Sequence, residues 1–197
     1  SDELTGTGLD LEGAAELLAG TGYGPDGEPL NLTMTVAAGD TDEMLVGASM
    51  KSNLAELGIE LDVQPLEWQA QWDRAISDNL DERQDIFVMY WWPDYPDPFS
   101  WFISMFYTEE EPNFNLAYYS DPDMDAAIDE IQSLTVTDRE AAEAKYIEVQ
   151  QQLIDDAVVV APYVQNYQRA LDASVAGYVD DPAYAQVPFV YEMSPQG

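Results

Sequence analysis

The sequence contains no cysteine and no histidine. Without a thiolate or an imidazole the chain cannot form a Ser-His triad, and it lacks the usual ligands of structural zinc and of haem. We therefore expect no metal and no cofactor. The missing cysteines say little about the redox compartment, because a chain of 197 residues can bury a core without disulfides.

Basic residues are scarce, since 6 Lys and Arg stand against 39 Asp and Glu, for a formal net charge of -33. No basic patch is available to neutralise the phosphates of a nucleic acid or an anionic membrane surface, so both are excluded as partners. Like charges destabilise the compact state at low ionic strength. At ~1 M salt the screening length falls to roughly 3 Å. We therefore predict a halophilic, haloarchaeal-like protein that works in molar salt.

Long apolar runs are also absent. A membrane-spanning helix needs about 20 apolar residues, and the longest apolar stretch, Ala157 to Val164, is shorter and contains Pro162. No secretory signal peptide is recognisable, so we expect a mature or N-terminally truncated chain. Apolar residues still make up 46% of the sequence, enough for the core of one domain, or of one domain and a fragment of another.

The first half of the chain alternates strand and helix patterns. Apolar residues of period two predict strands near 30–36 and 59–64, and a continuous apolar run predicts a central strand at 86–90, buried on both faces. Helical periodicity predicts helices over about 40–57 and 67–80. The resulting order β-α-β-α-β is typical of an α/β sheet with right-handed crossovers.

The second half changes from aromatic to helical. A proline-interrupted turn at 94–98 precedes an aromatic segment and an acidic loop. Asp121 with Pro122 predicts one helix start, and the run Thr137-Asp138-Arg139-Glu140 predicts a capping box at the next. A strand over 162–168 and a weak strand near 187–191 are expected to follow. The core faces of the two helices are predicted to be Met124, Ile128 and Ile131, and Ala142, Tyr146, Val149 and Leu153.

Four segments, in order along the chain, match motifs of one protein family. The first is GAAELL at 13–18 followed by Gly22-Tyr23, and the second is LAELGI at 54–59. The third is WPDYPDP at 92–98, and the fourth runs from NLAYY at 115–119 to the end of the following helices. In this order they resemble the C-terminal half of the dipeptide/oligopeptide-binding proteins, the family 5 extracellular solute-binding proteins of ABC importers.

The resemblance implies a periplasmic-binding-protein-like (type II) fold, whose two lobes enclose the ligand. Residues 11–171 would form the α/β second lobe, residues 172–197 a C-terminal tail that returns to the first lobe, and residues 1–10 a linker. The resemblance also implies a binding component, not an enzyme, that captures peptides or a related solute and passes them to ABC permease subunits. We accordingly expect an extracellular monomer at the cytoplasmic membrane, lipid-anchored in the full-length protein.

Asp94 is the first candidate for a ligand-binding residue. It follows the predicted strand at 86–90, at the carboxyl end where α/β sheets usually bind ligands. Asp94, Pro96 and Asp97 are also ordinary turn residues. In the proteins that the chain resembles, the matching acid pairs with the amino terminus of a peptide. A carboxylate there would make a charge-assisted hydrogen bond.

Six further residues complete the candidate site: Trp91, Trp92, Tyr95, Phe99, Asn115 and Tyr118. The aromatic members offer large, rigid contact area for a pocket wall, although they also suit a core. Trp91 and Trp92 would face opposite ways in a continuing strand, which leaves one of them for the pocket. Asn115 and Tyr118 match positions near the family's cleft, where they would bind the ligand backbone, or else cap a helix or satisfy a loop.

The ligand class stays open at this point. Aromatic loops beside acids would also suit a two-carboxylate glycoside hydrolase or an oligosaccharide-binding module, although no acid pair stands out among 39. A surface-layer module is a third interpretation. The acids from Asp121 to Asp129 superficially suggest a calcium loop, but they lack its turn glycine and final glutamate, so we expect a solvated face and no metal site.

Overall fold

The computed structural model describes residues 3–6, 8–25, 27–181, 184 and 187–195. Its first half is an α/β layer around a parallel sheet in the order β2-β1-β3. Strands and helices alternate along the chain as β1 (Leu30–Ala37), α2 (Thr41–Glu56), β2 (Ile59–Leu66), α3 (Trp68–Ala75) and β3 (Ile86–Phe87). The predicted β-α-β-α-β order is confirmed.

The two faces of the sheet are covered by different helices. On one face, Met34 and Leu61 belong to a buried cluster that packs against α2. On the other face, Phe87 lies against Trp68 and Trp72 of α3, with ring centroids 5.8 and 6.4 Å apart. Because the strands are parallel, their carboxyl ends meet at one edge of this sandwich, which is where α/β sheets bind ligands.

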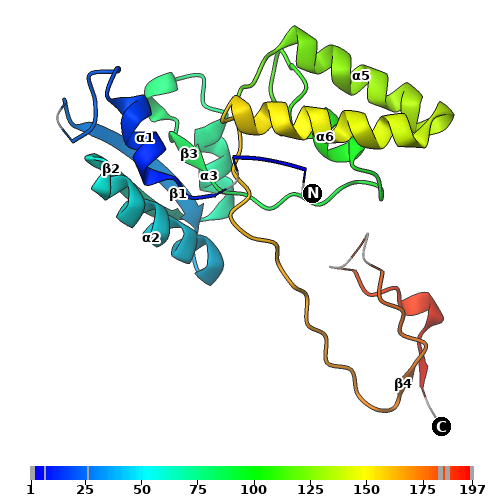
Figure 1. Cartoon of the computed structure of the whole chain (residues 1–197). Helices are drawn as coiled ribbons and strands as arrows, with labels where there is room; N and C mark the ends of the chain where they lie inside the picture. Colours follow the sequence, from blue (N-terminus) through cyan, green and yellow to red (C-terminus); the bar gives the residue numbers. More distant parts are fainter. Residues whose placement is uncertain (1–2, 7, 26, 182–183, 185–186, 196–197) are drawn as a thin grey trace.

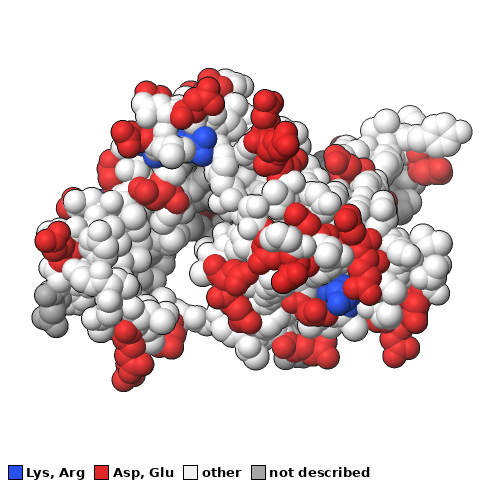
Figure 2. All heavy atoms as spheres, turned by 90° about the horizontal axis from the view of Figure 1, so that it is seen from above, with Lys and Arg blue, Asp and Glu red and all other residues white. Residues whose placement is uncertain are grey.

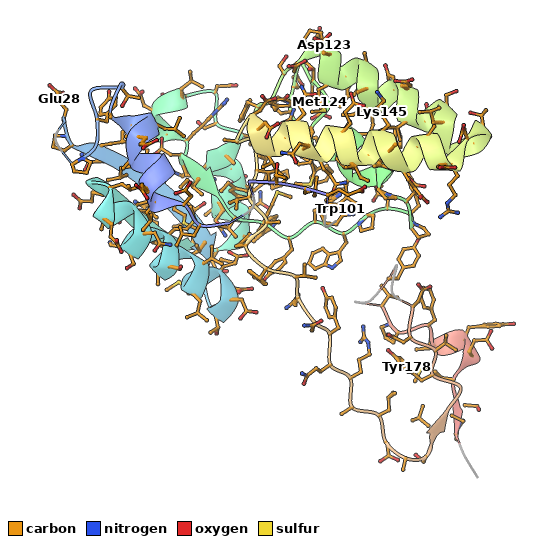
Figure 3. The ribbon with its side chains drawn as sticks, viewed as in Figure 1. Glu28, Trp101, Asp123, Met124, Lys145 and Tyr178 are labelled. Carbon is orange, nitrogen blue, oxygen red and sulfur yellow. The ribbon has the colours of Figure 1, made fainter. Side chains whose placement is uncertain are left out.

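A helical layer lies beside the sheet (Figure 1) and consists of α4 (Phe99–Met105), α5 (Pro122–Thr137) and α6 (Arg139–Asp155). Lys145 of α6 lies 3.4 Å from Glu130 of α5, which joins the two long helices at their surface (Figure 3). The helical spacing correctly predicted the core, since these residues are buried: Met124, Ile128, Ile131, Ala142, Tyr146, Val149 and Leu153.

The start of α5 depends on Asp121, as the sequence predicted. Its Oδ1 accepts hydrogen bonds from the backbone N–H of Asp123 at 2.7 Å and of Met124 at 3.1 Å. Replacing an Asp N-cap by Ala typically costs about 1 kcal/mol. We expect Asp121→Ala to lower the free energy of unfolding by about 1 kcal/mol, measured by denaturant unfolding in ~2 M KCl.

The control for this prediction is Asp123→Ala. Asp123 lies in the first turn of the same helix but caps nothing, and its attraction to the helix dipole is largely screened in ~2 M KCl, so Asp123→Ala should change the free energy of unfolding little. Equal losses in the two variants would show that negative charge, and not the capping hydrogen bonds, holds this end of α5.

The predicted central strand at 86–90 is wrong in length and in position. β3 contains only Ile86 and Phe87 and is half-buried. It forms an edge of the described sheet, whose centre is β1. Only Met34 and Thr35 of β1 pair with it. The apolar run continues beyond Phe87 because its side chains pack against the lobe, and not because the strand is longer. Val88, for example, packs against the buried cluster of Met34 and Leu61.

Two helix ends also differ from prediction. α3 ends at Ala75, because the chain turns back through η1 (Leu80–Glu82) and Arg74 Nε donates to the backbone oxygen of Glu82 at 2.6 Å. At α6 the cap is Asp138 and not Thr137, since the Asp138 side chain accepts from the backbone N–H of Ala141.

Beyond α6 the chain leaves the lobe as an extended segment (Figure 1). It ends in a small unit in which β4 (Val175–Ala176) pairs antiparallel with β5 (Ser194–Pro195), and which includes Tyr178 (Figure 3). The predicted strands at 162–168 and 187–191 are wrong. Residues 162–168 pair with no described strand. In place of the strand predicted near 187–191, the short 3-10 helix η3 (Val190–Glu192) begins at Val190.

The segment before α1 (Leu11–Leu18) is predicted to be a linker, yet its described part contacts the lobe. Asp10 caps α1 by accepting from the N–H of Gly13 at 2.9 Å, and the N–H of Thr5 donates to Gln151 of α6 at 2.9 Å. Among the described residues no helix combines the length and apolarity needed to span a bilayer. Residues 1–2, 7, 182–183, 185–186 and 196–197 of the predicted linker and tail lie outside the described residues.

Candidate ligand-binding site

Asp94 lies in the loop that joins β3 to α4. Its side chain is exposed. Its backbone N–H donates to Ser100 Oγ at 3.0 Å, which ties the loop to the first turn of α4. Within the described part of the chain, its carboxylate takes part in no hydrogen bond or ion pair. The loop that follows the carboxyl end of β3 therefore leaves this carboxylate exposed, where a ligand amine can reach it.

Asp97 anchors the same loop. Its Oδ1 accepts from the backbone N–H of Phe99 at 2.9 Å and from the hydroxyl of Tyr146 at 2.7 Å. These bonds link the loop to α4 and to the core of α6. Burial and the Asp97 carboxylate both raise the pKa of Tyr146, so its hydroxyl stays protonated and donates. The two acids of the motif thus differ in role, since Asp97 holds the loop and Asp94 faces solvent.

Trp92 forms an aromatic surface next to Asp94. Its ring stacks on Tyr90 with centroids 5.9 Å apart, and its Nε1 donates to the hydroxyl of Tyr167 at 2.9 Å. The hydroxyl of Tyr90 is in turn hydrogen-bonded to that of Tyr163. The side chain of Trp92 remains 42% exposed and that of Tyr95 43%. Both therefore keep surface that can contact a ligand.

Trp91 belongs to a different group of rings. It lies 4.6 Å from Phe114 and 6.4 Å from Trp101, measured between ring centroids. Its Nε1 is buried and finds no hydrogen-bond partner among the described residues. Trp91 and Trp92 thus have different aromatic neighbours, which agrees with the expectation that they face opposite ways. Trp92 is the one of the two that stays a candidate for the wall of the ligand pocket.

Phe99, Asn115 and Tyr118 serve the packing of the lobe. Phe99 packs against the helical core. Asn115 is 1% exposed, and its amide bonds the backbone of Tyr107 and Tyr119 on both sides of its own loop. Tyr118 donates to the backbone oxygen of residue 75 at 2.8 Å. Of the seven predicted site residues, Trp92, Asp94 and Tyr95 are therefore the three that combine exposure with proximity in the loop.

A groove that the sequence did not predict lies next to these aromatic residues. It encloses about 540 Å³ between α2 and the extended segment after α6. Tyr163 and its neighbours at 162–166 form one wall, and Asp42, Val46 and Met50 belong to the other. Tyr163 contacts Tyr90 and also borders the groove. The extended segment therefore connects the groove with the aromatic surface formed by Tyr90 and Trp92.

The surroundings of this edge are acidic. Burial raises the pKa of Tyr163, and the carboxylates of Asp40, Asp42 and Glu43 raise it further. Burial also raises the pKa of Glu43, although the N–H of Ala37 donates to that carboxyl. Figure 2 shows acidic side chains over much of the visible surface and basic ones at few places. The edge therefore favours a ligand with a positive group over an anion.

Sequence reasoning missed the tyrosines that hold Trp92. Tyr90 and Trp92 are two residues apart in an extended segment, so strand periodicity is the signal that would have put them on one side. Tyr163 and Tyr167 lie in a segment far along the chain, and no local pattern connects them with Trp92.

Residues 1–113 match the family model described as Bacterial extracellular solute-binding proteins, family 5 Middle. The chain belongs to this family. It is 27% identical over 169 residues to the Probable D,D-dipeptide-binding periplasmic protein DdpA of Escherichia coli, covering 85% of this chain and 31% of the relative. It is 23% identical over 154 residues to the Oligopeptide-binding protein AppA of Bacillus subtilis, a match that covers 78% of this chain and 27% of that relative. This family 5 chain thus spans about a third of the length of these relatives.

Solved structures of binding proteins share the fold of this family 5 chain. The Clavulanic acid biosynthesis oligopeptide binding protein 2 matches with a TM-score of 0.80 at 23% identity, over 95% of this chain and 34% of that protein. AppA from Bacillus subtilis, in complex with a nonapeptide, matches with a TM-score of 0.75 at 19% identity, over 100% of this chain and 41% of AppA. These likenesses confirm the α/β type II fold class.

Proposed function

We propose that this chain is part of the substrate-binding component of an ABC importer that captures peptides outside the cell. The observation that carries the proposal is the family match over residues 1–113. The exposed carboxylate of Asp94 and the exposed faces of Trp92 and Tyr95 support it, because they belong to the loop that follows the carboxyl end of a parallel strand. The component binds its ligand and uses no catalytic step.

In this proposal residues 11–171 form the second lobe, and residues 172–197 return to a first lobe supplied by the rest of a longer protein. Apolar side chains on the described part of the tail are exposed, with Val190 at 69% and Tyr191 at 92%. Exposed apolar surface of this kind usually marks an interface. The first lobe would cover it.

The remaining features of the proposal concern partners and place. The full-length protein works as a monomer at the extracellular face of the cytoplasmic membrane, held by a lipid anchor, and delivers its ligand to permease subunits. The net charge of -33 supports a salt-rich surrounding and argues against nucleic acid as a partner.

The test is thermal unfolding of the full-length protein in ~2 M KCl with tetra-alanine, Ala-Ala-Lys-Ala or maltotetraose. A ligand at 100 times its dissociation constant adds about 2.7 kcal/mol to the free energy of unfolding. We expect an upward shift of the melting temperature with the peptides. A shift with the sugar alone would replace the proposal by an oligosaccharide-binding module, and turnover of model glycosides would replace it by a hydrolase.

A further inference from the structure

The aromatic surface next to Asp94 is held by a residue from a distant part of the chain. Trp92 donates through Nε1 to the hydroxyl of Tyr167 at 2.9 Å, across 75 residues of sequence. Tyr90 stacks on the same indole, with an interplanar angle of 25°. A ring that is stacked on one neighbour and hydrogen-bonded to another has few orientations left. The exposed face of Trp92 is therefore presented in one position.

The segment that carries Tyr167 depends on such side-chain contacts. Residues 159–171 are extended, and no backbone hydrogen bond joins them to the rest of the described chain. Tyr163 and Tyr167 are four residues apart, which places both on the same side of an extended segment. They contact Tyr90 and Trp92 respectively. These two tyrosines therefore attach the segment to the ligand-facing loop.

We propose that Tyr167 is a positioning residue for ligand binding, which fixes the indole of Trp92 beside Asp94 and attaches the extended segment to the binding loop. The proposal rests on the proposed function, because it assumes that Trp92 contacts the ligand. Tyr167 itself need not touch the ligand. A ligand that packs on Trp92 meets a ring already held in place, so less side-chain entropy is lost on binding.

The size of the effect follows from the hydrogen bond. Trp92 is partly exposed, so water can replace the hydroxyl of Tyr167 in the variant Tyr167→Phe, and the net loss is that of one neutral hydrogen bond. In the variant the ligand must itself immobilise the indole, and an ordering cost of about 1 kcal/mol corresponds to a roughly fivefold weaker affinity. The unliganded variant has also lost the hydrogen bond, so it should melt at a slightly lower temperature than the wild type.

The experiment uses the full-length protein labelled with 5-fluorotryptophan, with tetra-alanine and Ala-Ala-Lys-Ala as the ligands. The variant Trp92→Phe assigns the ¹⁹F resonance of Trp92. We expect Tyr167→Phe to shift and broaden this resonance, and to weaken peptide binding about fivefold in calorimetry. The matched control is Tyr23→Phe, which removes a hydroxyl from a half-exposed tyrosine in another loop and should change neither quantity.

The double variant separates positioning from other roles. In the Trp92→Phe background, Tyr167→Phe should have no further effect on affinity, because its target is gone. An equal effect in both backgrounds, or an unchanged Trp92 resonance in Tyr167→Phe, would overturn the proposal. Wild-type protein that binds neither peptide would instead count against the proposed function and remove the ligand role of Tyr167. The ¹⁹F resonance would still decide whether Tyr167 fixes Trp92.

Discussion

In ~0.1 M KCl we expect the protein to be largely unfolded, and in ~2 M KCl to be folded. The net charge of -33 comes from 39 acidic against 6 basic residues, and Figure 2 shows acidic side chains at many places on the face that it draws. The screening length falls from about 10 Å at 0.1 M to about 3 Å at 1 M, which removes most repulsion between exposed carboxylates. The difference should be roughly 5 kcal/mol, the lower end of a typical domain stability. Thermal unfolding followed by circular dichroism across a KCl series measures it.

Two controls separate charge screening from general salt effects. Sucrose is uncharged and is excluded from the protein surface. At ~0.1 M KCl it should restore less folding than ~2 M KCl does, because it does not screen charge. Lowering the pH towards 4 protonates many carboxyl groups. With fewer negative charges the compact state repels itself less, so stability at low salt should rise as the pH falls. A melting temperature at pH 7 that is the same in low and high KCl would contradict the prediction.

Asp94→Asn should weaken the binding of a peptide with a free amino terminus by about a hundredfold, or about 2.7 kcal/mol. The carboxylate of Asp94 is exposed in the described structure and makes no hydrogen bond there, so the substitution keeps the shape of the loop and removes only the charge. A charge-assisted hydrogen bond to an ammonium group is lost, and the ammonium is left without its partner. Calorimetry with tetra-alanine on the full-length protein in ~2 M KCl measures the loss.

The matched control for Asp94 is Asp78→Asn, which changes the charge equally at another exposed aspartate. It should leave the affinity unchanged, because long-range attraction is screened at this salt concentration. N-acetylated tetra-alanine provides a second control, since it has no ammonium group and should bind wild type and Asp94→Asn alike. Equal losses in both aspartate variants would show a general field effect and remove the assigned role of Asp94.

The local features of the fold were predictable because they depend on residues close in sequence. Alternation at 30–36 and 59–64 located β1 and β2, and helical spacing located the buried residues of α5 and α6. The strands predicted at 86–90 and 162–168 failed for a shared reason. A strand exists through its ladder, and an apolar or extended run carries no information about whether a partner strand lies beside it.

The candidate site divides in the same way. Asp94 and Trp92 are predicted from the sequence because the motif and the carboxyl end of a predicted strand lie within a few residues of each other. Asp97 had the same turn chemistry, yet its role as an anchor depends on the hydroxyl of Tyr146, 49 residues further along the chain. Asn115 matched a family position, but its amide is used by the backbone of its own loop.

By itself the sequence determined the α/β class and the family, and it predicts a salt-dependent fold without a nucleic-acid partner. Composition, periodicity and short motifs carry this information, because they are properties of neighbouring residues or of sums over the chain. Only the tertiary structure decided which side chains meet. It separated Trp91 from Trp92, distinguished the anchoring Asp97 from the exposed Asp94, and brought Tyr167 to the indole of Trp92. Contacts between distant segments depend on how the chain returns to the lobe, which no local pattern encodes.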